Sequence, residues 1–94
     1  MRVLKLSGGD LASRLAARQI REEAIGYLYS GQIVTFDLSE IESMSASYAD
    51  ELFAVLVEEL GFEQFVRGVR LKRARQSVLI TIAIAIRERT ARGG

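Results

Sequence analysis

The 94-residue chain contains neither cysteine nor histidine. These absences exclude a disulfide framework, zinc or iron–sulfur sites with cysteine ligands, and catalysis that depends on an imidazole or a thiol. No uncharged apolar run reaches the roughly 18 residues of a membrane span, and the N-terminus lacks the hydrophobic block of a signal peptide. We therefore expect a soluble cytoplasmic protein that does not bind a membrane.

The size of the chain, 10.4 kDa with 49% apolar side chains, is that of one small globular domain. A chain this short buries only about two-thirds of its unfolded surface, which allows one core but not also a large enclosed substrate cavity. We predict a single domain over residues 1–90, followed by a disordered tail over residues 91–94.

The formal charge of +1 conceals a charge polarity along the chain. Residues 38–65 hold seven acidic side chains and no basic one, whereas residues 66–94 hold eight basic side chains and one acid, Glu88. Such a division within one small domain favours an interaction module, because oppositely charged surfaces can pair with a partner or with a second copy. A homo-oligomer is therefore one possible assembly.

Three segments have the pattern of strands, and two helices separate them. Strands are expected at Val3–Leu6, at Ile33–Leu38 and at Val69–Leu71. A first helix is expected from Leu11 to about Ser30, with Asp10 as its N-cap and with Arg14, Arg18 and Arg21 away from its apolar stripe. Phe62–Gly68 is interpreted as a connector.

The second helix has the clearest pattern in the chain. Apolar residues recur from Ala49 to Leu60 at helical spacing, and Gly61 ends the helix. Ser47 and Asp50 fit a capping box, in which each side chain accepts a hydrogen bond from a free backbone amide. Residues 77–89 fit both a strand and a helix, and we choose a helix because the run is long for a strand. The resulting β-α-β-α-β-α order predicts an α/β fold with helices packed on a mostly parallel sheet.

Residues 34–52 carry a resemblance to a known family. A strand that ends in Asp37-Leu38-Ser39, a short loop and a serine-rich helix start resemble the STAS domain of anti-sigma-factor antagonists. Ser47-Tyr48-Ala49-Asp50-Glu51-Leu52 is similar to the Ser-Phe-Ala-Asp-Glu-Leu signature of the bacterial STAS-like family DUF4325, and Ser13-Arg14 also resembles that family. The resemblance implies a STAS-like domain that regulates by protein interaction, with a GHKL-type ATPase or serine kinase as partner.

In the antagonists, phosphorylation of a serine at this helix start breaks the complex with the kinase. The usual Asp-Ser-Ser-Gly motif falls on Ser45-Ala46-Ser47-Tyr48, so the usual phosphoserine position holds Ala46. Ser47 and Ser45 remain as possible phosphosites. A phosphate there would add about −2 charge at a helix N-terminus, beside Asp50 and Glu51.

We predict a partner-binding surface on the loop from Ser39 to Ser47 and on the first turns of the following helix. Its candidate residues are Asp37, Ser39, Ser45, Ser47, Tyr48, Asp50 and Glu51. Structural roles remain open for several of them. Asp37 could accept hydrogen bonds from loop amides, and Tyr48, expected to be semi-exposed, could serve either packing or partner contact. The acids Glu58, Glu59 and Glu63 are most simply a solvated helix face.

A basic run offers an alternative function. It consists of Arg67, Arg70, Lys72, Arg73 and Arg75, which could bind phosphate or nucleic acid. Nucleic acid is the less favoured partner, because no aromatic residue alternates with these cations and the domain is nearly neutral. We expect no enzymatic activity and no cofactor. Asp50 and Glu51 are adjacent on a helix and so point about 100° apart, and no GxxxxGK phosphate loop is present.

Overall fold

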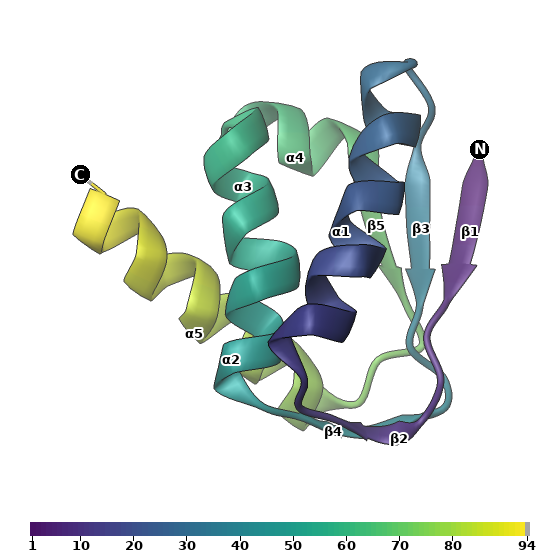
Figure 1. Ribbon diagram of the computed structural model, residues 1–94, viewed down its shortest axis with the longest axis vertical. Coiled ribbons are helices and arrows are strands. Elements are labelled where there is room, and N and C mark those ends of the chain that lie inside the picture. Colours follow the sequence, from purple (N-terminus) through teal and green to yellow (C-terminus); the bar gives the residue numbers. More distant parts are fainter. Residues whose placement is uncertain (94) are drawn as a thin grey trace.

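The computed structural model describes residues 1–93 and is built on a three-stranded parallel sheet (Figure 1). Its strands are β1 (Arg2–Lys5), β3 (Val34–Asp37) and β5 (Val69–Lys72), in the spatial order β1-β3-β5. All four residues of β3 are buried, as befits a central strand of β-branched and aromatic residues. The predicted α/β class with a parallel sheet is confirmed.

Helices cover this sheet on one side. These are α1 (Arg14–Tyr29) and a second, continuous helical segment that we call the central helix, residues 46–60. The central helix comprises α2 (Ala46–Ala49), the π-helical turn η1 (Asp50–Ala54) and α3 (Val55–Leu60). Phe53 of η1 meets Phe36 of β3 edge-on, with ring centroids 5.1 Å apart. The helical periodicity of the sequence correctly predicted the buried face of this segment, which includes Leu52 and Leu56.

The start of α1 differs from the prediction, because a second small sheet precedes it. Gly8 and Gly9 have positive φ angles of 112° and 71° and turn the chain after β1. The next residues form β2 (Gly9–Leu11), which pairs in parallel with β4 (Ile41–Met44). Asp10 therefore lies in a strand and accepts a hydrogen bond from the Ser43 hydroxyl. Ser13 is the N-cap instead, and its hydroxyl accepts from the amide of Ala16 at 3.2 Å.

Residues 77–89, whose sequence fits both a strand and a helix, form part of helix α5 (Gln76–Gly93), as predicted. Val78, Ile82 and Ala85 are buried at helical spacing, and the helix packs against η1, α2 and β4. This helix is the third of the predicted order, and it packs mainly on the other helices rather than on the three-stranded sheet. Residues 91–93 belong to this helix, which differs from the predicted disordered tail, and residue 94 lies outside the described residues. Figure 1 shows that the C-terminal part of α5 points away from the sheet.

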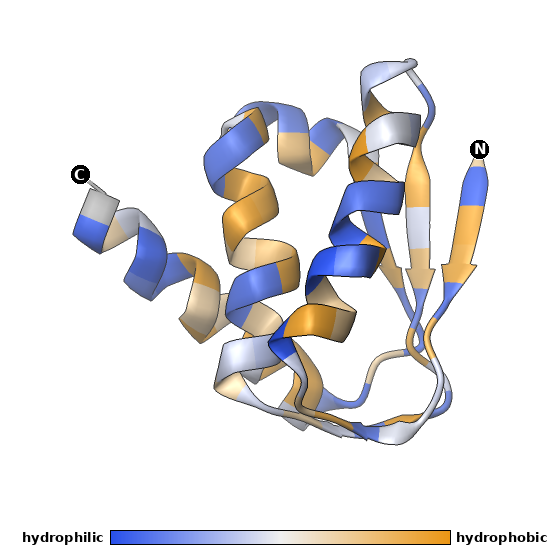
Figure 2. Ribbon diagram, in the orientation of Figure 1, coloured by the Kyte–Doolittle hydropathy of each residue, from blue (hydrophilic) through white to orange (hydrophobic). Residues whose placement is uncertain are grey.

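A short helix also replaces the predicted connector before β5. This helix, α4 (Phe62–Gly68), buries Phe65 against the core. Figure 2 shows hydrophobic residues along β3 and the inner part of the central helix, and hydrophilic residues at the C-terminal end of α5. None of the helices within residues 1–93 combines the length and apolarity that a membrane crossing requires.

Candidate functional site

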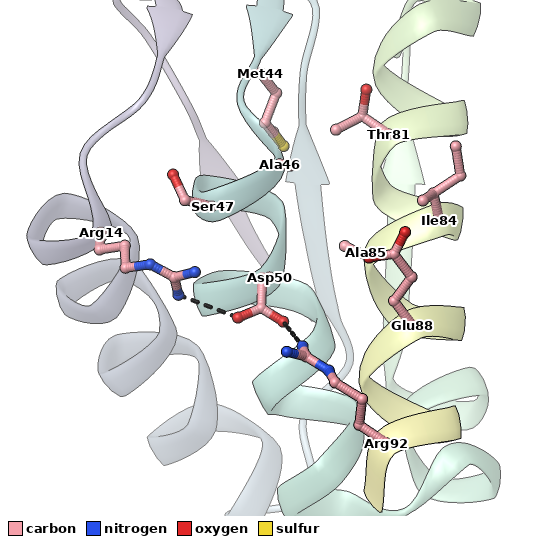
Figure 3. Close-up of a pocket in the computed structure, with 10 residues that line it drawn as sticks. All are labelled: Arg14, Met44, Ala46, Ser47, Asp50, Thr81, Ile84, Ala85, Glu88 and Arg92. Carbon is pink, nitrogen blue, oxygen red and sulfur yellow. Dashed lines mark hydrogen bonds and ion pairs between the residues drawn. The ribbon is translucent and has the colours of Figure 1, made fainter.

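A cleft opens where the central helix begins, between α1 and α5 (Figure 3). Its volume is about 480 Å³. The lining residues are Arg14, Met44, Ala46, Ser47, Asp50, Thr81, Ile84, Ala85, Glu88 and Arg92. Two of the predicted surface residues, Ser47 and Asp50, thus lie in one cleft together with Ala46.

The first turn of the central helix is capped by Ser45, not by Ser47. The Ser45 hydroxyl accepts a hydrogen bond from the Tyr48 amide at 3.0 Å, which is the geometry of an N-cap. The Ser47 hydroxyl lies 3.1 Å from that of Ser45. The predicted Ser47–Asp50 capping box is therefore wrong, because the N-cap lies two residues earlier, at Ser45, and Asp50 already lies inside the helix. Ala46, at the usual phosphoserine position, is exposed.

Asp50 is a buried carboxylate held by arginines from two other helices. Arg89 of α5 donates to its two oxygens at 2.8 and 2.7 Å, and Arg14 of α1 donates at 3.1 Å. Arg92 lies 3.7 Å away. The guanidinium of Arg89, assisted by that of Arg14, lowers the pKa of Asp50 from 3.8 to about 2, although burial acts in the opposite direction. Asp50 therefore joins α1, η1 and α5 (Figure 3).

Glu51 is paired in a similar way with α1. Arg21 binds its carboxylate at 2.6 Å and also donates to its backbone carbonyl, and Arg14 donates to the carboxylate at 3.1 Å. These contacts, that with Arg21 first, hold the pKa of Glu51 below its usual range. Although Asp50 and Glu51 are adjacent on a helix, Arg14 contacts both of them. Their charges are thus largely neutralised within the chain.

The sequence suggested that the acidic face of the central helix is simply a solvated surface. The structure shows instead that two of its acids pair with arginines of other helices. Glu58 binds Arg89 at 3.1 Å, and Glu59 lies 3.6 Å from Arg21. The acidic middle of the chain is thus flanked by arginines from α1 on one side and from α5 on the other. The charge polarity of the sequence is in large part satisfied within one molecule.

Tyr48 belongs to the core. Only 3% of its surface is exposed, and burial raises the pKa of its hydroxyl. The expectation of a semi-exposed Tyr48 is therefore wrong, because the helix begins at Ala46 and this places residue 48 on its inner face. A partner cannot contact this side chain without rearrangement of the domain.

Asp37 and Ser39 lie at the end of β3, and neither lines the cleft. The Asp37 carboxylate accepts a hydrogen bond from the Ser39 amide at 3.0 Å, which lowers the pKa of Asp37. The structural role that the sequence left open for Asp37, as an acceptor for loop amides, is confirmed. Ser39 itself is exposed.

The basic run is divided by the fold. Arg67 pairs with Glu63 at 2.7 Å on the same helix. Arg70 donates to the backbone carbonyls of Val66, Arg67 and Val69, at the end of α4, where free carbonyls attract a cation. Lys72, Arg73 and Arg75 are exposed. Two of the five cations thus have partners within residues 1–93.

Sequence reasoning missed the part of the site that α5 contributes. Thr81, Ile84 and Arg92 line the cleft, and Arg89 binds the central carboxylate. The spacing of Arg89 and Arg92 by three residues places both on one helix face, which is a signal that could have indicated a shared acidic partner. The acidic partner of Arg89, Asp50, however, lies 39 positions away in the sequence.

Comparison with known proteins places the chain in a family. No curated protein and no solved structure matches it at the significance that we required. Residues 16–79, about two-thirds of the chain, match the family described as "STAS-like domain of unknown function (DUF4325)". This range includes the central helix and its flanking strands β3 and β5. The chain therefore belongs to the STAS-like DUF4325 family.

Proposed function

We propose that this domain is a non-catalytic regulatory module of the cytoplasm, and that it binds a protein partner through the start of the central helix. The observation that carries the proposal is the accessible cleft beside Ala46 and Ser47. The Asp50 carboxylate, which lines this cleft, and the neighbouring Glu51 carboxylate are already paired with arginines. A partner would therefore bind backbone, small side chains and the cleft rather than an unpaired acidic face.

The proposed partner is an ATPase or kinase of the GHKL type. Support comes from the resemblance to anti-sigma-factor antagonists, in which the equivalent helix start is the surface that such a kinase binds. In this chain that segment is Ser45–Ser47, and it lies at the surface of the domain next to α5. The position of the usual phosphoserine, Ala46, is exposed but has no hydroxyl.

Ser47 is the better of the two proposed phosphosites. The Ser45 hydroxyl is occupied as the helix cap, whereas Ser47 lines the cleft together with Arg14 and Arg92. A phosphate on Ser47 would be near free amides of the first helical turn and near these arginines, which stabilise negative charge. It would also alter the charge of the proposed contact surface, and so release the partner.

A charge placed at Ala46 tests the proposed surface. We expect Ala46→Glu to weaken binding to a purified GHKL-type ATPase from the same cell by at least about tenfold, because it adds bulk and charge to the contact. Glutamate is favourable in the first turn of a helix, so the domain should remain folded. Isothermal titration calorimetry measures the change, and circular dichroism verifies the fold.

Gln19→Glu is the matched control. It introduces the same change of charge at an exposed position of α1 that does not line the cleft, and binding should stay within about twofold of the wild type. Equal affinities for the wild type and Ala46→Glu would contradict the proposed surface. Failure of the wild type to bind the ATPase would contradict the proposed partner.

A further inference from the structure

Helix α5 has an apolar surface on its outer side as well as on its buried side. Val78, Ile82 and Ala85 face the core, while Leu79, Ile80 and Ile84 are 42%, 51% and 40% exposed. Residues 76–86 contain no charged side chain. A solvent-facing helix surface is normally polar, so this stretch has the composition of a helix that is covered on both sides.

A groove beside α5 enlarges this apolar surface. It has a volume of about 550 Å³ and is lined by Phe62, Ala83, Ile86, Arg87, Thr90 and Ala91. Phe62, at the start of α4, is 64% exposed. Together with the outer face of α5, these side chains expose roughly 400 Å² of apolar surface, which is the size range of patches that mediate association.

We propose that this surface, formed by the outer face of α5 and the groove at Phe62, binds a second copy of the chain in a two-fold, antiparallel arrangement of the α5 helices. The charges at the two ends of the apolar stretch support this occupant. Arg87 ends the stretch and lines the groove, whereas Gln76 at the other end is exposed and uncharged. These two residues share one helix face, and in an antiparallel pair Arg87 of one copy lies at the level of Gln76 of the other.

The same two-fold arrangement matches the apolar residues. An axis at the level between Thr81 and Ile82 brings Ile80 of one copy to the level of Ala83 of the other, and Leu79 to the level of Ile84. Arg87 then faces Gln76 of the second copy, and the two Arg87 side chains stay roughly 16 Å apart, beyond the Debye length of about 10 Å at ordinary salt. A parallel pair would instead bring the two Arg87 side chains together.

The size of the surface fits a modest homodimer. A standard interface covers about 800 Å² on each partner and is about 65% apolar in homodimers. That area is roughly one-seventh of the 5435 Å² surface of the chain. The exposed apolar surface around α5 supplies most of the apolar area that such an interface needs on each copy. The dipoles of two antiparallel helices also favour the arrangement.

Sedimentation equilibrium over a wide range of protein concentration tests the proposal without any other protein. We expect the wild type to form dimers, and we expect Ile80→Glu and Ala83→Glu each to weaken the dimer at least about tenfold. Neither residue lines the cleft at the start of the central helix, so this result is independent of ATPase binding. Leu15→Glu, at a 62% exposed position of α1, is the matched control and should leave the dimer unchanged.

Charge substitution at Gln76, which does not line the cleft, tests the antiparallel arrangement. Gln76→Glu should strengthen the dimer by roughly fivefold, because it places a carboxylate at the level of Arg87 of the second copy, and Gln76→Arg should weaken it by a similar factor. Equal dimer affinities of the two variants would overturn this arrangement. A wild type that stays monomeric at every concentration would overturn the dimer and would leave this surface to a different protein.

Discussion

Tyr48→Ala is expected to lower the free energy of unfolding by about 3 to 4 kcal/mol, the largest effect that we predict for a single side chain. Tyr48 is 3% exposed and packs in the core beside the first turn of the central helix. Its removal leaves a cavity that the surrounding helices cannot fill completely. Chemical denaturation followed by circular dichroism measures the loss of stability.

Tyr48→Phe separates packing from any role of the hydroxyl. The hydroxyl makes no hydrogen bond with residues 1–93, so its removal should change stability by less than about 0.5 kcal/mol. The Tyr-to-Phe difference between this chain and the family signature then concerns a core position that either ring can fill. A Tyr48→Ala variant as stable as the wild type would show that the side chain is at the surface.

Arg89→Ala is expected to lower the free energy of unfolding by about 3 kcal/mol. The variant leaves the buried Asp50 carboxylate with Arg14 and the more distant Arg92, and an incompletely paired buried charge is strongly destabilising. Arg92→Ala is the matched control on the same helix. The Arg92 side chain is 69% exposed, so its loss should cost less than about 0.5 kcal/mol. Equal effects of the two substitutions would contradict the central role of Arg89.

The Asp50 cluster also makes stability depend on pH. The pKa of Asp50 is about 2 in the folded chain and 3.8 when unperturbed, so the unfolded chain binds the proton more tightly. The stabilisation is therefore present above about pH 5 and is lost as the pH falls towards 2. Chemical denaturation at several pH values measures this dependence. Between about pH 5 and pH 2, the free energy of unfolding should fall by about 2 kcal/mol less in Asp50→Asn than in the wild type. The same pH dependence in both proteins would contradict the ion pairs.

Much of the fold could be predicted because it follows from local periodicity. The β-branched run around Phe36 predicted the central strand, and the spacing of Leu52, Phe53 and Leu56 predicted the central helix. The strands β2 and β4 could not be found in this way, because they are three and four residues long and pair across about 30 residues of sequence. Because β2 was not predicted, the N-cap of α1 was assigned to Asp10 instead of Ser13.

The candidate site was predicted only in part. The serine-rich helix start drew attention to Ser45, Ser47 and Asp50, and the structure places the last two in one cleft. The contribution of α5 could not be predicted, because periodicity shows that a helix has an apolar face but not which helix that face meets. For the same reason, the acidic middle and the basic end of the sequence suggested binding to another molecule, whereas Arg89 binds Asp50 and Glu58 within the chain.

The most direct test of the proposed function is to map the contact surface by amide chemical shifts of the ¹⁵N-labelled domain during titration with the GHKL-type ATPase. We predict that the largest changes fall on Ser45, Ala46 and Ser47 and on the part of α5 that lines the same cleft. Amides of the basic run, residues 67–75, should change little. Changes confined to residues 67–75, with the start of the central helix unaffected, would contradict the proposed surface and support the phosphate-binding alternative.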